Sequence, residues 1–289
     1  MENCDILIIG AGAAGIAAAK AAAEAGCENI LLVDRKKRMG GVLLQCAHRG
    51  FGRNQTGPEY TEKLLEGFPE SVRWLPDTTV QTIREDRTAL LRGPETGRVE
   101  VAFRQLILAT GCREIPMGAL NIAGTRPQGI YTAGQLQEMM NLHGFVPSGP
   151  AVILGSGDLG LVMARQLARL GITVTIVERM PHCGGMAKNR HCLREYPIKL
   201  VCNATVTEVY GEKTLEGVRI SQNIPIPCRT LLIAAGMRPE RELIRGLQEA
   251  PWLHICGNCN TVHPMVEAVV NEGKQAGLSA YENIRGSLW

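Results

Sequence analysis

The chain has 289 residues, of which 45% are hydrophobic and 20% are charged, a composition that indicates packed globular domains and excludes a disordered chain. The formal net charge of +3 and the aromatic content of 4% exclude the strongly basic or aromatic-rich surfaces by which many proteins hold nucleic acids. The first residues lack the basic segment of a signal peptide, and their apolar run is too short to span a bilayer. We therefore expect a cytoplasmic protein without a membrane span, whose ten cysteines are mostly reduced thiols.

The first predicted unit extends from Asp5 to Asp34. An apolar strand over 6–9 leads into the glycine turn G-A-G-A-A-G at 10–15, an alanine-rich helix and a second strand over 30–33. In such a turn the first glycine permits the tight bend, the second lets a pyrophosphate approach the backbone, and the third allows helix and strand to pack closely. The pyrophosphate binds at the positive end of the helix, and Asp34 can accept hydrogen bonds from ribose hydroxyls. The unit predicts a βαβ dinucleotide-binding fold.

The following segment connects this unit to a small sheet. Gly40-Gly41 opens a stretch that is neither clear helix nor clear strand, and residues 58–67 predict a short amphipathic helix. Three alternating runs at residues 79–83, 88–91 and 99–103, the latter two separated by glycine and proline, predict a β-meander. We expect a separate buried strand over 106–109, ending at Thr110-Gly111.

The sequence then repeats itself. Residues 151–179 match the first unit nearly residue for residue, with a second glycine turn over 155–160 and with Glu178 in the place of Asp34. A strand over 231–235 that ends in Gly236 matches the strand that ends in Thr110-Gly111. Two dinucleotide folds in one chain indicate either two bound nucleotides or one nucleotide and one relic site.

These patterns predict an α/β fold with two Rossmann-like dinucleotide-binding domains and a β-meander. We expect residues 1–113 and 247–289 to form one domain and residues 114–246 to form the second, inserted domain.

Four motifs in this order resemble the pyridine nucleotide–disulfide oxidoreductase superfamily: G-A-G-A-A-G with Asp34, L-I-L-A-T-G, G-S-G-D-L-G with Glu178, and the late C-G-N followed by a helix. Members of that superfamily place FAD on the first unit and NAD(P)H on the inserted one. The segments G-G-V-L-L-Q-C-A-H-R-G-F-G, T-G-P-E-Y and G-S-G-D-L-G-L-V-M-A-R are similar to flavoproteins encoded beside glycerol-3-phosphate dehydrogenase and to subunits of amino-acid and opine dehydrogenases. Those relatives usually continue into a further C-terminal region, and this sequence ends at Trp289. The usual late G-D is here Gly257-Asn258, whose amide can still bond a ribityl hydroxyl.

The resemblance implies two sets of cofactor-binding residues. For FAD they are Gly10, Gly12, Ala13, Ala14, Gly15, Asp34, Arg35, Gly41, Val80, Ala109, Thr110, Gly111, Asn258 and Val266. For NAD(P) they are Gly155, Gly157, Asp158, Leu159, Gly160, Glu178, Arg179 and Gly236.

At the positions where relatives carry a redox-active pair of cysteines, this sequence does not have both cysteines. Dithiol–disulfide exchange needs a nucleophilic and a resolving thiol, but the thioredoxin-reductase C-x-x-C position reads Q-G-I-Y-T-A-G-Q-L-Q, and only Cys46 follows Gly40-Gly41. Cys46 and His48 are candidate catalytic residues near the flavin, with a buried inert thiol and a surface histidine as the alternatives. Cys256 and Cys259 form a C-x-x-C that could be a redox pair or a ligand pair, and we interpret it as packing.

No metal site is predicted. His182-Cys183 and His191-Cys192 look like half a zinc site, but they lack a tight C-x-x-C pair, so we interpret them as parts of polar loops.

Two further features concern the cofactors. Residues 263–267 read as a helix start with Pro264 in the first turn, and its N-terminus, aimed at the flavin pyrimidine, would stabilise the negative charge of the reduced ring. Glu178 favours NADH because a carboxylate beside the adenosine ribose repels a 2′-phosphate. Arg179 and Arg190 favour NADPH instead, since a guanidinium can bind the 2′-phosphate through two hydrogen bonds.

The sequence thus predicts an FAD-dependent oxidoreductase that passes a hydride between NAD(P)H and flavin without the usual active-site disulfide. Electrons would go to or come from a small molecule or a redox partner protein, and we expect a homo-oligomer or a subunit of a dehydrogenase complex. Two alternatives remain open. One is an FAD subunit of a multi-subunit dehydrogenase whose second nucleotide site does not use NADH, and the other is a non-catalytic nucleotide-binding protein.

Overall fold

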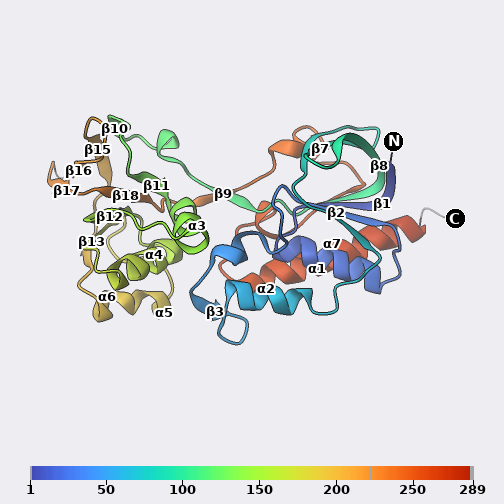
Figure 1. Ribbon diagram of the computed structural model, residues 1–289, viewed down its shortest axis with the longest axis horizontal. Coiled ribbons are helices and arrows are strands. Elements are labelled where there is room, and N and C mark those ends of the chain that lie inside the picture. Colours follow the sequence, from blue (N-terminus) through green and yellow to red (C-terminus); the bar gives the residue numbers. More distant parts are fainter. Residues whose placement is uncertain (1, 222, 287–289) are drawn as a thin grey trace. The chain divides into compact units, whose positions relative to one another are not determined.

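A computed structural model describes residues 2–221 and 223–286, which fold into two compact units (Figure 1). Unit 1 comprises Met1–Arg113 and Arg238–Trp289, and unit 2 comprises Glu114–Met237. The prediction of an α/β fold with two Rossmann-like parallel sheets is confirmed. No helix in the part of the chain that is described has the length and the hydrophobicity needed to cross a membrane.

The end of the inserted unit differs from the expected boundary at residue 246. The chain returns to unit 1 at Arg238, because residues 238–247 already belong to the core and polar contacts of that unit. Ile244 and Leu247 are buried in it, and the Glu240 N–H donates to the Gly111 carbonyl oxygen over 3.0 Å.

Unit 1 is built around a mixed sheet. Its elements up to the insertion are β1 (Glu2–Ile9), α1 (Ala13–Glu24), β2 (Ile30–Val33), η1 (Gly41–Gln45), β3 (Arg49–Phe51), β4 (Gln55–Thr56), α2 (Gly57–Leu65), β5 (Val72–Leu75), β6 (Thr79–Ile83), β7 (Thr88–Gly93), β8 (Gly97–Leu108) and β9 (Cys112–Glu114). After the insertion come β19 (Met237–Pro239), η3 (Glu242–Ile244), β20 (Leu253–Ile255), η4 (Gly257–Cys259) and α7 (Val266–Gly286). The sheet order is β5-β2-β1-β8-β7-β6, with β20 also paired to β8.

The long strand β8 corrects one expectation, because the runs at 99–103 and 106–109 were expected as separate strands. They form one continuous strand since β1 runs parallel to it along both halves, from Glu2 opposite Val101 to Ile9 opposite Leu108. The first half of β8 also pairs antiparallel with β7 to complete the meander, and the second half pairs parallel with β20. One strand therefore joins the meander to the parallel part of the sheet.

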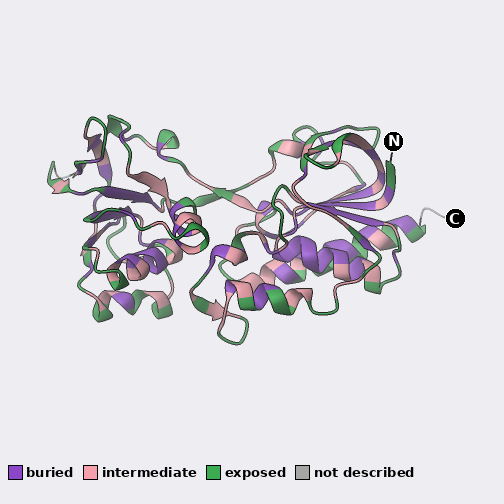
Figure 2. Cartoon of the chain, in the orientation of Figure 1, coloured by how far each residue is buried: buried purple, intermediate pink, exposed green. Residues whose placement is uncertain are grey.

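The alanine-rich helix α1 packs directly against the last helix, α7 (Figure 1). A Cβ at Gly273 would lie 2.2 Å from the Ala14 carbonyl oxygen, and a Cβ at Gly277 would lie 2.3 Å from the Ala18 carbonyl oxygen. Small residues on both helices are therefore required by the close approach of their backbones. Many of the buried residues of unit 1 lie along α1 and the central strands (Figure 2).

Helix α7 begins at Val266, so Pro264 precedes the helix and does not lie in its first turn as the sequence suggested. The residues before the helix are held in a loop, in which the His263 N–H donates to Asn258 Oδ1 over 3.0 Å. The short helix α2 begins after Thr56, where a reciprocal capping box with Glu59 fixes its start.

Unit 2 repeats the same βαβ arrangement. Its elements are η2 (Met117–Ala119), β10 (Ala123–Gly124), β11 (Ile130–Thr132), α3 (Ala133–His143), β12 (Ala151–Leu154), α4 (Asp158–Arg169), β13 (Val174–Val177), α5 (Ala187–Arg190), α6 (Cys192–Glu195), β14 (Lys199–Val201), β15 (Val206–Tyr210), β16 (Gly217–Ile220), β17 (Pro225–Pro227) and β18 (Thr230–Ile233). A parallel sheet of order β11-β18-β12-β13-β14 carries the second glycine turn, and a smaller sheet has the order β10-β15-β16-β17. Strands β12 and β18 are buried along their whole length (Figure 2).

Candidate functional site

The first glycine turn joins β1 to α1 and fits a dinucleotide. Gly10 has φ +104°, and a Cβ there would lie 2.4 Å from the Ala109 carbonyl oxygen; a Cβ at Gly15 would lie 1.8 Å from the Gly10 carbonyl oxygen. At Gly12 a Cβ would meet no atom within 4 Å. The outer two glycines are thus required by the fold itself, whereas the space at Gly12 is open at the N-terminus of α1, where a pyrophosphate is bound in such folds.

Asp34 fixes the shape of this turn. Its Oδ2 accepts from the Ala11 N–H over 2.7 Å, and its Oδ1 accepts from the Lys36 N–H over 2.8 Å. The Gly40-Gly41 loop lies against the same turn, because the Gly40 N–H donates to the Ala11 carbonyl oxygen over 2.7 Å. A Cβ at Gly41 would lie 3.0 Å from the Gly12 Cα atom, so only a residue without a side chain leaves the turn accessible here.

The remaining residues expected at FAD belong to unit 1 and lie at several element ends. Ala109, Thr110 and Gly111 follow β8, and the Thr110 hydroxyl donates to the Glu240 carbonyl oxygen over 2.8 Å. Val80 is half-buried on β6. Thr78, two residues before it, donates its backbone N–H to the Asp34 carbonyl oxygen and so holds the start of β6 near the glycine turn. Ala13 and Ala14 occupy the first turn of α1, Arg35 is exposed after β2, and Val266 is the first residue of α7.

The structure argues against Cys46 as a nucleophile. Its side chain is buried, its Sγ lies 3.3 Å from the Val42 carbonyl oxygen, and burial raises the pKa of the thiol to about 12. A thiol with such a pKa is protonated at neutral pH and therefore unreactive. His48 lies two residues later and is half-buried, with its ring centroid 5.2 Å from that of Phe51.

The C-x-x-C thiols are also buried in unit 1. Cys259 Sγ lies 3.0 Å from the Leu108 carbonyl oxygen, and Cys256 Sγ is directed at the same oxygen. Burial raises the pKa of both thiols. These contacts favour the interpretation that the pair packs against β8 over a redox role.

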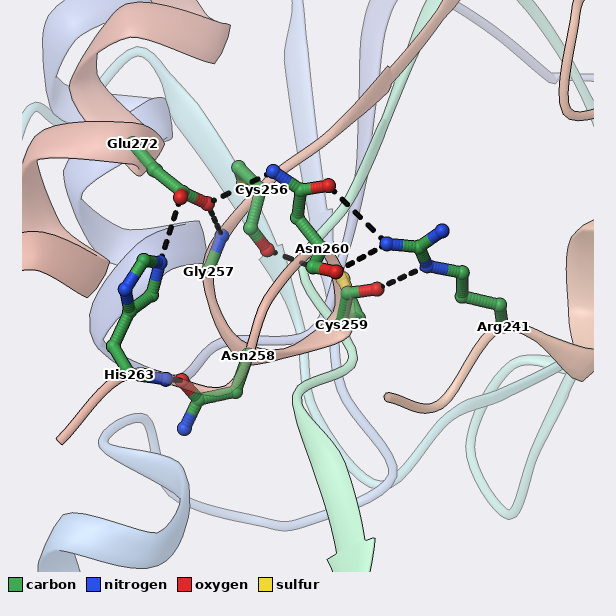
Figure 3. A network of polar contacts seen from close by, with 8 residues as sticks. All are labelled: Arg241, Cys256, Gly257, Asn258, Cys259, Asn260, His263 and Glu272. Carbon is green, nitrogen blue, oxygen red and sulfur yellow. Dashed lines mark hydrogen bonds and ion pairs between the residues drawn. The ribbon is translucent and has the colours of Figure 1, made fainter. Parts of the chain in front are cut away.

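A polar network surrounds the late Gly257-Asn258 segment, and the sequence analysis did not identify it. Glu272 on α7 accepts from the Gly257 N–H over 2.8 Å through Oε2, and its Oε1 lies 2.6 Å from His263 Nε2 (Figure 3). Asn260 Nδ2 also donates to Glu272, over 3.4 Å, and Arg241 donates to the Asn260 and Cys259 carbonyl oxygens. The sequence signal for this network is weak: Glu272 is an acidic residue directly before Gly273, one of the two glycines of α7 that pack against α1.

The second glycine turn reproduces the first. Gly155 has φ +105°, and a Cβ there would lie 2.4 Å from the Ala234 carbonyl oxygen; a Cβ at Gly160 would lie 2.3 Å from the Gly155 carbonyl oxygen. Gly157 is open, as Gly12 is, and precedes the first residue of α4. Unit 2 therefore also carries a backbone cradle at a helix N-terminus that fits a pyrophosphate.

The carboxylate of Asp158 fastens the following loop to this turn. Its Oδ1 accepts from the Met186 N–H over 2.8 Å and from Asn189 Nδ2 over 2.6 Å. Leu159 packs into the core of unit 2, and Gly236 follows β18 with φ +122°.

Glu178 takes the part that Asp34 plays in unit 1. Its Oε2 accepts from the Ser156 N–H over 2.8 Å and from the Ser156 hydroxyl over 2.7 Å, and its Oε1 accepts from the Met180 N–H over 2.9 Å. Burial alone would raise the pKa of Glu178, but the hydrogen bonds from Ser156 and Met180, with the charge of Arg179, lower it below its ordinary value. The side chain is therefore a carboxylate at neutral pH. The next residue, Arg179, is exposed, whereas Glu178 is buried.

The histidine–cysteine pairs of unit 2 lie in and beside its short helices, with His182 exposed and Cys192 buried. Across residues 2–221 and 223–286 we find no group of three or more His, Cys, Asp or Glu side chains placed to hold a metal ion.

Known proteins share this arrangement. Residues 4–253 match the family model described as pyridine nucleotide-disulphide oxidoreductase. One subunit of the opine oxidase of Rhizobium meliloti is 29% identical over 84% of this chain and 52% of its own length. Thioredoxin reductase of Mycolicibacterium smegmatis is 26% identical over 85% of this chain and 79% of its own length.

The fold likeness extends over nearly the whole chain. The crystal structure of T. acidophilum thioredoxin reductase superposes with a TM-score of 0.78 at 19% identity, covering 98% of this chain and 99% of that one. The chain spans about half the length of the first curated relatives that it matches, with 52%, 53% and 56% of their lengths covered. Because the family model covers most of the sequence, including both glycine turns, the chain belongs to the pyridine nucleotide-disulphide oxidoreductase family, whose members are FAD-dependent oxidoreductases that use pyridine nucleotides.

Proposed function

We propose that unit 1 binds FAD, that unit 2 binds NAD(P)H with a preference for NADH, and that the protein exchanges electrons with an external acceptor or partner. The observation that carries the proposal is the duplicated cradle. In each unit the middle glycine is open, and a carboxylate at the end of the second strand holds the turn through a backbone N–H. When both cofactors are bound, they supply hydride transfer between nicotinamide and flavin.

The protein's own residues bind and orient the cofactors in this proposal. Backbone N–H groups at the start of α1 and of α4 would hold the two pyrophosphates, because each helix dipole favours negative charge there. Asp34 and Glu178 hold the two turns in shape before any ligand arrives, which lowers the ordering cost of binding.

The preference for NADH rests on Glu178. Its pKa lies below the ordinary value, so a negative charge is present at the end of β13, where the adenosine ribose of a dinucleotide lies in such folds. A 2′-phosphate placed there would be repelled. Arg179, which follows Glu178, and Arg190, at the end of α5, are exposed and offer a competing attraction, but neither takes the position of Glu178 at the strand end.

The three thiols that the sequence suggested for redox chemistry are poorly placed to pass electrons to a disulfide substrate. Cys46, Cys256 and Cys259 are all buried, with pKa values raised by burial. We therefore infer that electrons leave the flavin toward a small molecule or a partner protein and do not pass through a protein dithiol.

Anaerobic mixing with NADH tests the proposal. The purified protein should carry non-covalent FAD. The yellow absorbance of the oxidised flavin should disappear when NADH is added, because the flavin is reduced. A protein that binds FAD but stays yellow with both NADH and NADPH would refute the role assigned to unit 2.

A second candidate function is an FAD-binding subunit of a multi-subunit oxidase or dehydrogenase whose second nucleotide site does not use NADH. The similarity to the opine oxidase subunit, of which the chain covers about half, favours it. Affinity purification separates the two, because only a component of such a complex should bring down catalytic partners while its flavin stays oxidised with NADH. A chain that stays yellow and brings down no partner would support a non-catalytic nucleotide-binding role.

A further inference from the structure

Helix α7 carries a carboxylate that reaches the loop before it, and that loop contains a residue expected to contact the flavin. Glu272 lies beside Gly273, whose backbone approaches α1 so closely that a Cβ there would stand 2.2 Å from the Ala14 carbonyl oxygen. The position of Glu272 is therefore fixed by helix packing, independently of the loop.

The carboxylate binds the loop at three points. Glu272 Oε2 accepts from the Gly257 N–H over 2.8 Å and from Asn260 Nδ2 over 3.4 Å, while Oε1 lies 2.6 Å from His263 Nε2 (Figure 3). Gly257 is buried and has φ +68°, and its N–H is satisfied by the Glu272 carboxylate. The side chains of His263 and Glu272 are 19% and 27% exposed, so their contact is only partly open to solvent.

Asn258 lies between these anchored residues. Its Oδ1 accepts from the His263 N–H over 3.0 Å, which fixes the side-chain amide, and its Nδ2 group points away from the network (Figure 3). Arg241 holds the opposite side of the loop through the Cys259 and Asn260 carbonyl oxygens. The loop is thus fastened on both sides, with the Asn258 amide as the group presented outward.

We propose that Glu272 is a positioning residue for the flavin: its carboxylate holds the 257–263 loop in the conformation that presents the Asn258 amide to the cofactor. This inference rests on the proposed function, since it requires that unit 1 bind FAD. Glu272 acts on the cofactor only through Gly257, Asn260 and His263.

The test uses the full chain stripped of flavin and titrated with FAD, followed by flavin fluorescence and visible circular dichroism. Glu272→Ala should weaken FAD binding by at least about 10-fold, equivalent to about 1.4 kcal/mol, and should change the dichroism of the bound flavin. Glu272→Gln should lose less affinity, because one amide oxygen can still accept from the Gly257 N–H. Glu282→Gln is the matched control on an exposed part of the same helix, and it should behave as the parent does.

Thermal unfolding distinguishes positioning from a general loss of stability. A positioning role predicts that the rise in Tm caused by a fixed FAD concentration becomes smaller in Glu272→Ala, because that rise depends on the dissociation constant. If only the apoprotein Tm falls and the FAD-induced rise is unchanged, the inference is wrong. If Glu272→Ala does not fold, parental affinity and dichroism in Glu272→Gln overturn the inference instead. A parent chain that binds no FAD would overturn the proposed function itself, whereas tight FAD binding by parent and variants alike overturns only the role of Glu272.

Discussion

The substitution Gly12→Val should separate cofactor binding from folding. The backbone at Gly12 has φ −79°, which any residue can adopt, and a Cβ there would meet no atom within 4 Å. The added side chain therefore fills only the space that we assign to the pyrophosphate. Gly15, three residues later, is the contrasting position, because a Cβ there would lie 1.8 Å from the Gly10 carbonyl oxygen and could not be accommodated without moving the backbone.

The expected magnitudes follow from this geometry. Replacing glycine where the backbone permits it stabilises a protein by about 0.4–1 kcal/mol, and valine is a poorer helix N-cap than glycine by a similar amount. The free energy of unfolding of the apoprotein should thus change by less than about 1 kcal/mol. Losing two charge-assisted hydrogen bonds to the pyrophosphate costs about 3–6 kcal/mol, so FAD binding should weaken at least about 100-fold.

Flavin absorbance of the isolated protein, FAD titration and urea unfolding of the apoprotein measure these quantities. Gly157→Val is the matched control, because Gly157 is equally open in unit 2; it should keep FAD and lose reduction by NADH. Full flavin occupancy in Gly12→Val would refute the assignment of the pyrophosphate site, and a loss of several kcal/mol in apoprotein stability would refute the reasoning about open space.

Four further predictions concern the thiols, the acidic residue of unit 2 and the helix crossing. Replacing Cys256 and Cys259 together by alanine should leave NADH-dependent dye reduction within a few-fold of the parent; loss of activity with FAD still bound would make the pair a redox centre. Cys46 has its pKa raised to about 12, so iodoacetamide should leave it unmodified in the native protein from pH 7 to 9 and modify it after unfolding; peptide mass spectrometry reads both states. Two unit charges about 4 Å apart interact by about 4 kcal/mol at an effective dielectric of about 20, and a quarter of that, about 1 kcal/mol, is several-fold in rate. Glu178→Ala should therefore raise kcat/KM for NADPH and lower it for NADH, and a parent that already prefers NADPH contradicts the assignment. Gly273→Ala should lower the free energy of unfolding by about 1–3 kcal/mol, because the new methyl group meets backbone; an unchanged urea midpoint would show that α7 can move away.

The nucleotide folds could be predicted because their sequence signals are local. The strand, glycine turn and helix from Ile6 to Glu24 follow one another without interruption, and their repeat from Ala151 has the same order. The length of β8 was not predictable in this way. Whether residues 99–103 and 106–109 form one strand depends on β1, which pairs with both halves although it lies about a hundred positions earlier in the chain.

The same distinction applies to the site. Asp34 and Glu178 were predicted as site residues because they lie at fixed places after their glycine turns; the structure shows each of them bonded to its own turn, and their contact with a ribose stays a prediction. The network of Glu272 and His263 could not be inferred, because it depends on how the loop before α7 folds back onto the second turn of that helix, which no local pattern in the sequence indicates. Cys46 was proposed from its place after Gly40-Gly41, and only the three-dimensional packing shows that its thiol is enclosed.

The contact of α7 with α1 has a consequence for how the protein is made. The inserted unit is continuous from Glu114 to Met237, whereas unit 1 needs both ends of the chain. Domains fold as units during synthesis, in the order in which they leave the ribosome. Unit 2 can therefore complete its sheet while α1 is still without α7, and β8 is still without β20. Because Asn258 and Val266, which we assign to FAD, follow the inserted unit in the sequence, the proposed flavin site would be complete only after unit 2 has been synthesised. FAD would then bind late, to a chain whose second Rossmann-like fold is already in place.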